Sequence, residues 1–166
     1  MSEIVVRRAQ PSDASAIAAI YAQGEACAQT LQLPMANEPL WQSRLQNIPD
    51  NVTSLVAEYD GIVIGNLGLE LCPQLRRRHV AHFGMGVKDE FHGKGVGSAL
   101  IKAALDLADN WLNVRRLELN VYIDNRAAIA LYEKHGFVIE GESKDFAFRN
   151  GEYVNVFHMA RIKQGI

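Results

Sequence analysis

The fold of this chain is decided by the stretch Phe91-His92-Gly93-Lys94-Gly95-Val96-Gly97-Ser98, which leads directly into an apolar run over residues 99–111. In that run, apolar residues recur at helical spacing, namely Leu100, Ala103, Ala104, Leu107 and Trp111. Charged residues fall between them. This period predicts a helix that begins just after the glycines.

The three glycines point to an anion site. Glycines before a helix let backbone N–H groups approach a ligand, and the helix dipole adds partial positive charge at that end. We therefore expect the loop to bind phosphate, although the loop alone is equally consistent with a plain connection between a strand and a helix. Gly93, Gly95 and Gly97 are spaced G-x-G-x-G, which is neither the Walker pattern nor the Rossmann pattern.

The bulk composition is that of an ordinary globular protein. The chain has 166 residues, 48% of them hydrophobic and 22% charged, with a net charge of −2. We expect a single domain over residues 1–166. Arg76-Arg77-Arg78 with His79 is too short a basic cluster to indicate nucleic acid. Cys27 and Cys72 lack metal-ligand spacing. No segment resembles a signal peptide or a membrane span. We therefore expect a cytoplasmic protein with no metal, nucleic acid or membrane partner.

The order of elements predicts a mixed sheet. Strand patterns cover residues 4–9, 52–59, 62–71, 78–87 and 116–123, with two more strands between 137 and 162. Helical patterns follow Pro11, surround Trp41 and Leu45, and cover 125–135. The turns Asp60-Gly61 and Asn150-Gly151 favour antiparallel hairpins. The expected fold is an α/β (α+β) domain with about seven mostly antiparallel strands and helices on both faces.

Two motifs give the chain a resemblance to a known family. Val87-x-x-x-x-His92-Gly93-Lys94-Gly95-Val96-Gly97-Ser98 and Asn125-x-x-Ala128-x-x-x-Tyr132-x-x-x-Gly136-Phe137 stand in this order and spacing. With the order of elements, they make the chain resemble the GNAT N-acetyltransferase superfamily over its whole length. Further matches, such as Arg149-Asn150-Gly151-Glu152-Tyr153, are similar to the bacterial L-amino-acid N-acetyltransferase branch. The resemblance also implies a homodimer.

The resemblance implies an acetyl-CoA site and assigns residues to it. The loop backbone would hold the pyrophosphate, with the implied residues His92, Gly93, Lys94, Gly95, Val96, Gly97 and Ser98. The backbone of Met85, Gly86 and Val87 would pair with the pantetheine arm as an added strand. Asn125 would contact the pantetheine or orient the site, and Tyr132 would protonate the departing thiolate. His92 stands where the family has Gln or Arg, so the loop backbone is expected to hold the phosphates.

Elementary chemistry supports these roles. Tyr132 follows Asn125 by seven residues, so the two lie about 10 Å apart on nearly the same helix face. A phenol with a pKa of about 10 stays protonated at neutral pH and can donate to sulfur. Gly84 and Gly86 indicate either a β-bulge or a close approach to the backbone. A bulge would free one N–H to polarise the thioester carbonyl. Taken alone, Tyr132 fits a packing aromatic better than an acid, and only the surrounding motif favours the catalytic role.

The base that deprotonates the amine stays open at this point. The family has Glu where Asn120 stands, and Asn cannot accept a proton. Glu118 is the nearest carboxylate on the same strand face, although it could instead form an ion pair with Arg115 or Arg116. His79 and His82 titrate nearest neutrality. A water held by Glu118, Asn120 or a strand carbonyl would also serve.

These features predict direct transfer of an acetyl group from acetyl-CoA to a primary amine of a small molecule, with a free L-amino acid as the expected acceptor. Three alternatives remain. The chain could be a non-catalytic acyl-CoA sensor, or an acetyltransferase for a protein N-terminus or an antibiotic amine. The loop could also bind a nucleotide phosphate. Met35, Trp41 and Leu45 could wall an acceptor pocket, and Arg76-Arg77-Arg78 could attract a substrate carboxylate.

Overall fold

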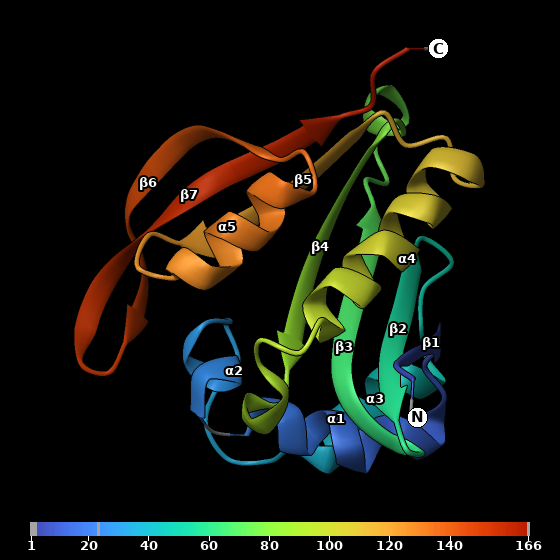
Figure 1. Cartoon of the computed structure of the whole chain (residues 1–166), viewed down its shortest axis with the longest axis vertical. Helices are drawn as coiled ribbons and strands as arrows, with labels where there is room; N and C mark the ends of the chain where they lie inside the picture. Colours follow the sequence, from blue (N-terminus) through green and yellow to red (C-terminus); the bar gives the residue numbers. More distant parts are fainter. Residues whose placement is uncertain (1–2, 23, 166) are drawn as a thin grey trace.

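The chain forms one seven-stranded mixed sheet in the order β1-β2-β3-β4-β5-β7-β6 (Figure 1). The computed structural model describes residues 3–22 and 24–165. Every neighbouring pair of strands is antiparallel except β4 and β5, which run parallel. The strands are β1 (Val5–Arg8), β2 (Val52–Tyr59), β3 (Ile62–Leu71), β4 (Val80–Val87), β5 (Arg116–Tyr122), β6 (Val138–Arg149) and β7 (Glu152–Ile162). This architecture confirms the predicted fold class.

Helices cover both faces of the sheet (Figure 1). The helices are α1 (Ala14–Tyr21), α2 (Gly24–Ala28), α3 (Glu38–Gln46), α4 (Val96–Asn110) and α5 (Arg126–Lys134). Helices α1 and α3 pack against one face of the sheet, and the core between them includes Ile17, Leu45 and Val56. Helix α4 packs on the other face in a larger core that includes Leu100, Leu117 and Phe137.

Local signals in the sequence explain how these elements begin and end. Asp60 and Gly61 have φ of 51° and 76°, and Asn150 and Gly151 have φ of 51° and 79°. Two successive left-handed residues are what a tight hairpin turn requires. Helix α5 begins where the Asn125 side chain accepts a hydrogen bond from the Ala128 N–H. Both hairpins and this helix therefore form where the sequence predicted them.

Helix α4 differs from its prediction at both ends. It begins at Val96, within the glycine loop, with Gly95 as its N-cap, and it ends at Asn110. Trp111, which the helical spacing placed on the apolar stripe, is 76% exposed. Its φ of −129° takes it out of the helix. The prediction for Trp111 is therefore wrong, because the helix stops one residue before it.

Strands β4 and β5 are hydrogen-bonded only at one end. Their register covers three pairs, from Val80↔Arg116 to His82↔Glu118, and the two strands separate after that point (Figure 1). On its other side, β4 pairs with β3 without interruption from Ala81 to Val87. The bulge predicted at Gly84 and Gly86 is therefore wrong, whereas the alternative, a close approach to the backbone, is confirmed at Gly86, where a Cβ would lie 2.4 Å from the Tyr21 ring. The open edge of β4 comes from the divergence of its neighbour.

Three aromatic rings pack beneath this divergence. Phe83 from β4, Tyr132 from α5 and Phe137 lie in edge-to-face pairs, with centroid distances of 5.8–5.9 Å. Phe137 is 1% exposed and Phe83 is 4% exposed. Because edge-to-face pairs stabilise beyond the area they bury, this cluster ties α5 to the sheet where β5 leaves β4.

Phe137→Ala is expected to lower the free energy of unfolding by about 3–5 kcal/mol, because it empties a fully buried ring site. Urea denaturation of the purified variant measures the change. Phe148→Ala is the control, since Phe148 is 64% exposed and its loss should cost less than about 1 kcal/mol. Equal costs for the two variants would contradict the central role of the aromatic cluster.

Candidate active site

The free edge of β4 presents unpaired backbone groups. The Lys88 N–H donates to Ile64 O, and the Cys72 N–H donates to Val80 O. In an antiparallel ladder, hydrogen-bonded pairs alternate with pairs whose backbone groups face outward. The register of β3 with β4 therefore points the N–H and C=O groups of odd-numbered β4 residues toward β5. Beyond the last β4–β5 pair, His82↔Glu118, the residues whose N–H and C=O groups both lie clear of β5 are Met85 and Val87.

A cavity of about 1460 Å³ runs through the gap between β4 and β5. On the α4 side it is lined by the glycine loop and by Asn125 and Tyr132 of α5. On the opposite side it is lined by α1, α3 and the sheet floor. One continuous cavity therefore joins the loop at the start of α4 to a second compartment across the sheet.

The glycine loop offers a row of backbone donors. Gly93 and Gly95 have φ of 74° and 85°, a left-handed conformation that glycine adopts without a steric penalty. The Ala99 N–H is bonded to Gly95 O. The preceding N–H groups of the first helical turn have no acceptor within the helix. Such a helix end suits an anion, and the loop therefore fits a pyrophosphate.

At Gly97, close packing leaves no room for a side chain. A Cβ at this position would lie 2.8 Å from the Leu131 side chain and 3.2 Å from Met85 Cε. The lack of a side chain lets α4 pack closely against α5 and the open edge of β4. Gly97 therefore sets the distance between the anion site and the gap.

Side chains of the loop are held by the protein itself. His92 Nε2 lies 2.8 Å from Val87 O, and Lys94 Nζ lies 5.4 Å from the centre of the Phe91 ring. Val96 is 1% exposed. Ser98 Oγ lies 2.9 Å from His135 Nε2. Burial, together with nearby Lys134 and Lys102, lowers the pKa of His135. The side chains of His92 and Ser98 are thus engaged within the protein, and that the loop backbone holds the phosphates stays a prediction.

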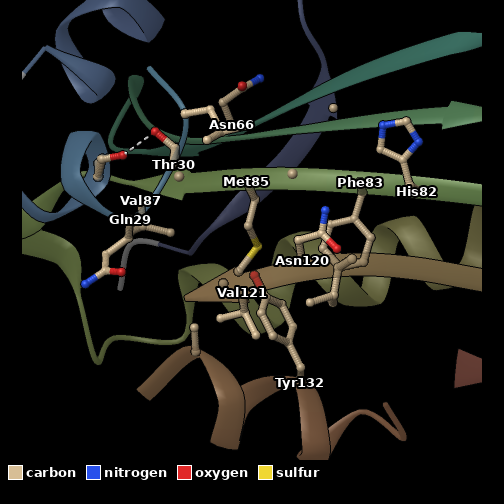
Figure 2. Close-up of a pocket in the computed structure, with 18 of the residues that line it drawn as sticks. Gln29, Thr30, Asn66, His82, Phe83, Met85, Val87, Asn120, Val121 and Tyr132 are labelled. Atoms are coloured by element: carbon tan, nitrogen blue, oxygen red, sulfur yellow. Dashed lines mark hydrogen bonds between the residues drawn. The ribbon is translucent and has the colours of Figure 1, made fainter. Parts of the chain in front are cut away.

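Tyr132 projects from α5 toward the gap. In Figure 2 its hydroxyl group points toward Met85 and Val121, which belong to the two diverging strands. The side chain is 8% exposed, and burial raises its pKa to about 12. Its hydroxyl has no hydrogen-bond partner among the described residues. Tyr132 is therefore a protonated phenol with an uncommitted O–H in the cavity.

Asn125 lines the same cavity, as its spacing from Tyr132 predicted. Its Oδ1 accepts from the Ala128 N–H at 3.2 Å and caps α5. A capping residue of this kind fixes the start of its helix. Asn125 therefore orients the helix that carries Tyr132.

The second compartment has an open floor and an aromatic wall. A Cβ added at Gly68 or Gly84 would meet nothing within 4 Å. A Cβ at Gly86 would lie 2.4 Å from the ring of Tyr21. Tyr21 stacks on Trp41 at 5.3 Å, and the Arg44 guanidinium lies 4.9 Å from the Trp41 ring centre.

Two of the three residues that the sequence suggested as pocket walls are in place. Trp41 and Leu45 line the cavity, and the short helix predicted around them is α3. Met35 is 84% exposed and lies outside the lining. The prediction for Met35 is wrong, because the loop before α3 directs this residue away from the sheet.

The three candidate bases lie in different surroundings. Glu118 accepts hydrogen bonds from Arg77 at 2.9 Å and from Arg116 at 3.1 Å, which favours the ion pair that the sequence left open. His79 lies in the turn before β4, next to a separate smaller cavity, and not on the strand as predicted. His82 lies on the cavity floor, with Nε2 3.4 Å from Glu70.

Sequence reasoning missed His158 of β7. Its Nδ1 lies 2.6 Å from Asn120 Oδ1, and its Nε2 lies 2.5 Å from Ser143 Oγ. His158 lines the cavity beside Asn120. The alternation of the last hairpin was visible in the sequence, but the register that places His158 opposite Asn120 depends on which strand pairs with β5.

No group of three or more His, Cys, Asp or Glu side chains is arranged to hold a metal ion in the part of the chain that the structure describes. Within residues 3–22 and 24–165, no helix is both long and apolar enough to cross a membrane.

Comparison with known proteins gives consistent matches. A model of the acetyltransferase (GNAT) family matches residues 22–137. The chain is 47% identical over 163 residues to the L-amino acid N-acetyltransferase AaaT of Escherichia coli, covering 98% of this chain and 100% of that protein. It is 36% identical over 104 residues to the spermidine N(1)-acetyltransferase of Escherichia coli, covering 63% of this chain and 55% of that protein.

Solved structures share the same architecture. An acetyltransferase of the GNAT family from Streptococcus pneumoniae matches with a TM-score of 0.83 and 28% identity over 96% of this chain and 99% of that one. Spermidine N-acetyltransferase from Vibrio cholerae, in complex with CoA and spermine, matches with a TM-score of 0.84 and 26% identity over 96% and 95%. The chain belongs to the GNAT acetyltransferase family, whose members transfer the acetyl group of acetyl-CoA to an amine.

Proposed function

We propose that this enzyme acetylates the α-amine of free L-amino acids. The observation that carries the proposal is the 47% identity, over nearly its whole length, to an enzyme named for that activity. The cavity through the sheet supports it, because it offers an anion-binding loop at one end and an open compartment at the other. A small acceptor fits a compartment whose floor is made of glycines.

The cofactor side of the cavity fits acetyl-CoA, which supplies the acetyl thioester. The backbone at Gly93–Ser98 would hold the pyrophosphate, and the free edge of β4 would bond the pantetheine arm as a strand does. Since Val87 O already faces His92, the Met85 N–H and C=O are the groups best placed for this pairing. A free N–H at this edge would also polarise the thioester carbonyl.

Tyr132 supplies the proton for the leaving sulfur. Its raised pKa keeps the phenol protonated at neutral pH, and its hydroxyl is uncommitted. As the acetyl group passes to the amine, the O–H proton moves to the sulfur, and the phenolate is then reprotonated from solvent.

His82 is the group that we propose to take the proton lost by the amine. It lies two residues before Gly84 on β4, on the face that we assign to the acceptor. Its Nε2 lies 3.4 Å from a carboxylate oxygen of Glu70 on β3. Imidazole is the side chain that most often serves as a general base, whereas the Glu118 carboxylate is occupied by hydrogen bonds from two arginines.

The function is tested by incubating the purified protein and acetyl-CoA with free L-amino acids, a polyamine, an aminoglycoside and peptides with a free N-terminus. We expect free thiol to appear with the amino acids. Release confined to the peptides would contradict a small-molecule acceptor. Acetyl-CoA binding without thiol release over the whole panel would favour the sensor alternative.

Tyr132→Phe removes the proposed acid while keeping the ring in its aromatic cluster. We expect kcat to fall by about 10²-fold or more, with little change in the KM for acetyl-CoA. Steady-state thiol release measures both constants. Wild-type kcat in this variant would remove Tyr132 from its proposed role.

His82→Gln and Glu118→Gln distinguish the candidate bases. We expect His82→Gln to lower kcat by about 10²-fold and Glu118→Gln to lower it by much less. Thermal melting of both variants shows whether either change acts through folding. A larger loss of kcat in Glu118→Gln than in His82→Gln, with equal melting temperatures, would reverse the assignment.

A further inference from the structure

We propose that the side-chain amide of Asn120 binds the carboxylate of the acceptor amino acid, and that His158 holds the amide in the orientation that allows this. The proposal rests on the proposed function, since it concerns how that acceptor is recognised. It gives Asn120, which cannot act as the base, a role in binding the acceptor.

Asn120 lies at the edge of the gap, on the acceptor side. It lies two residues after Glu118, the last β5 residue paired with β4. Leu117, Leu119 and Val121 face the core beneath α4, so the alternation of the strand turns Asn120 to the opposite face. Figure 2 shows Asn120 among the residues that line the cavity.

A directed chain of hydrogen bonds fixes the Asn120 side chain. Its Oδ1 can only accept a hydrogen bond, so His158 Nδ1, 2.6 Å away, carries a proton and donates it. The other ring nitrogen, Nε2, is hydrogen-bonded to Ser143 Oγ at 2.5 Å, so the imidazole is held at both of its nitrogens. Side chains from β6 and β7 therefore hold the Asn120 amide of β5, and its oxygen is committed to His158.

This arrangement leaves the amide nitrogen for a ligand. Among the residues that the structure describes, Asn120 Nδ2 has no hydrogen-bond partner. An NH₂ group donates two hydrogen bonds and accepts none. It therefore suits an anionic oxygen, and a carboxylate bound there would receive a charge-assisted hydrogen bond.

The charges around Asn120 permit an anion. The nearest carboxylate on its strand, Glu118, is held by Arg77 and Arg116. A Glu in place of Asn120 would put an acceptor-only group against the carboxylate of an amino acid. A neutral amide donor in that place removes this repulsion.

The size of the acceptor favours Asn120 over Arg44. Amine and carboxylate of an α-amino acid share one carbon atom, so the anchor must lie beside the reacting centre at the gap. Arg44 is an arginine without a carboxylate partner in the described part of the cavity lining. However, it stacks on Trp41, which in turn stacks on Tyr21, the ring that contacts Gly86. The rings of Trp41 and Tyr21 therefore separate Arg44 from β4.

The test compares one L-amino acid that the enzyme accepts with its carboxamide, which keeps the side chain and the amine but lacks the anion. The quantity measured is the ratio of kcat/KM for the acid to that for the amide. In Asn120→Asp, we expect this ratio to fall by about tenfold or more, through the KM for the acid. The control Gln46→Glu makes the same change on the exposed surface of α3 and should keep the wild-type ratio.

His158 is tested by the same ratio. His158→Ala frees the amide to rotate and should lower the acid-to-amide ratio, whereas His158→Gln, whose NH₂ can still donate to Asn120 Oδ1, should retain more of it. A role for His158 in folding alone would lower the melting temperature and leave the ratio unchanged, which would overturn its positioning role.

The outcomes separate this inference from the proposed function. An enzyme that acetylates neither acid nor amide would refute the function. Equal losses for acid and amide in Asn120→Asp would refute the carboxylate contact while the function stands. An unchanged ratio in Asn120→Asp with a lowered ratio in Arg44→Gln would assign the carboxylate to Arg44 and overturn the proposal for Asn120.

Discussion

The structure depends on one constraint: β4 and β5 are hydrogen-bonded over three residue pairs and then part. A parallel pair that continued to Val87 would satisfy the backbone of β4 and close the sheet. Because it stops at His82, the edge of β4 keeps its polar groups, a cavity joins the two faces, and Tyr132 reaches the opening from α5. The aromatic cluster of Phe83, Tyr132 and Phe137 holds α5 beneath the place where the strands diverge.

Much of this could be predicted from local sequence. Asp60-Gly61 and Asn150-Gly151 fixed two hairpins because left-handed turns need such residues. Asn125 and Gly136 bounded α5, where Asn125 caps the helix and Gly136 has a φ of 92°. The glycine loop and the Asn125–Tyr132 spacing predicted two groups of residues that line the cavity on the α4 side, since each signal lies within one segment of the chain.

Features that depend on pairing between distant segments could not be predicted. The glycines of β4 suggested a bulge, yet the opening arises from where β5 leaves, and no residue of β4 encodes that. His158 stands beside Asn120 only because β7 lies next to β5 in the sheet, although β6 precedes it in the chain. The sequence offered Arg116 as an ion-pair partner of Glu118, because the two are neighbours on one strand. The second partner, Arg77, lies forty-one residues earlier and could be recognised only from the structure.

The alternation of β4 separates two kinds of evolutionary change. Its odd-numbered residues turn their side chains to the core beneath α4, and Met85 and Val87 also turn backbone groups to the gap. His82, Gly84 and Gly86 line the cavity on the opposite face. Substitutions on one face can therefore accumulate with little effect on the other. In a family built on such a strand, the acceptor amine can therefore change from one member to another while the residues facing acetyl-CoA stay the same.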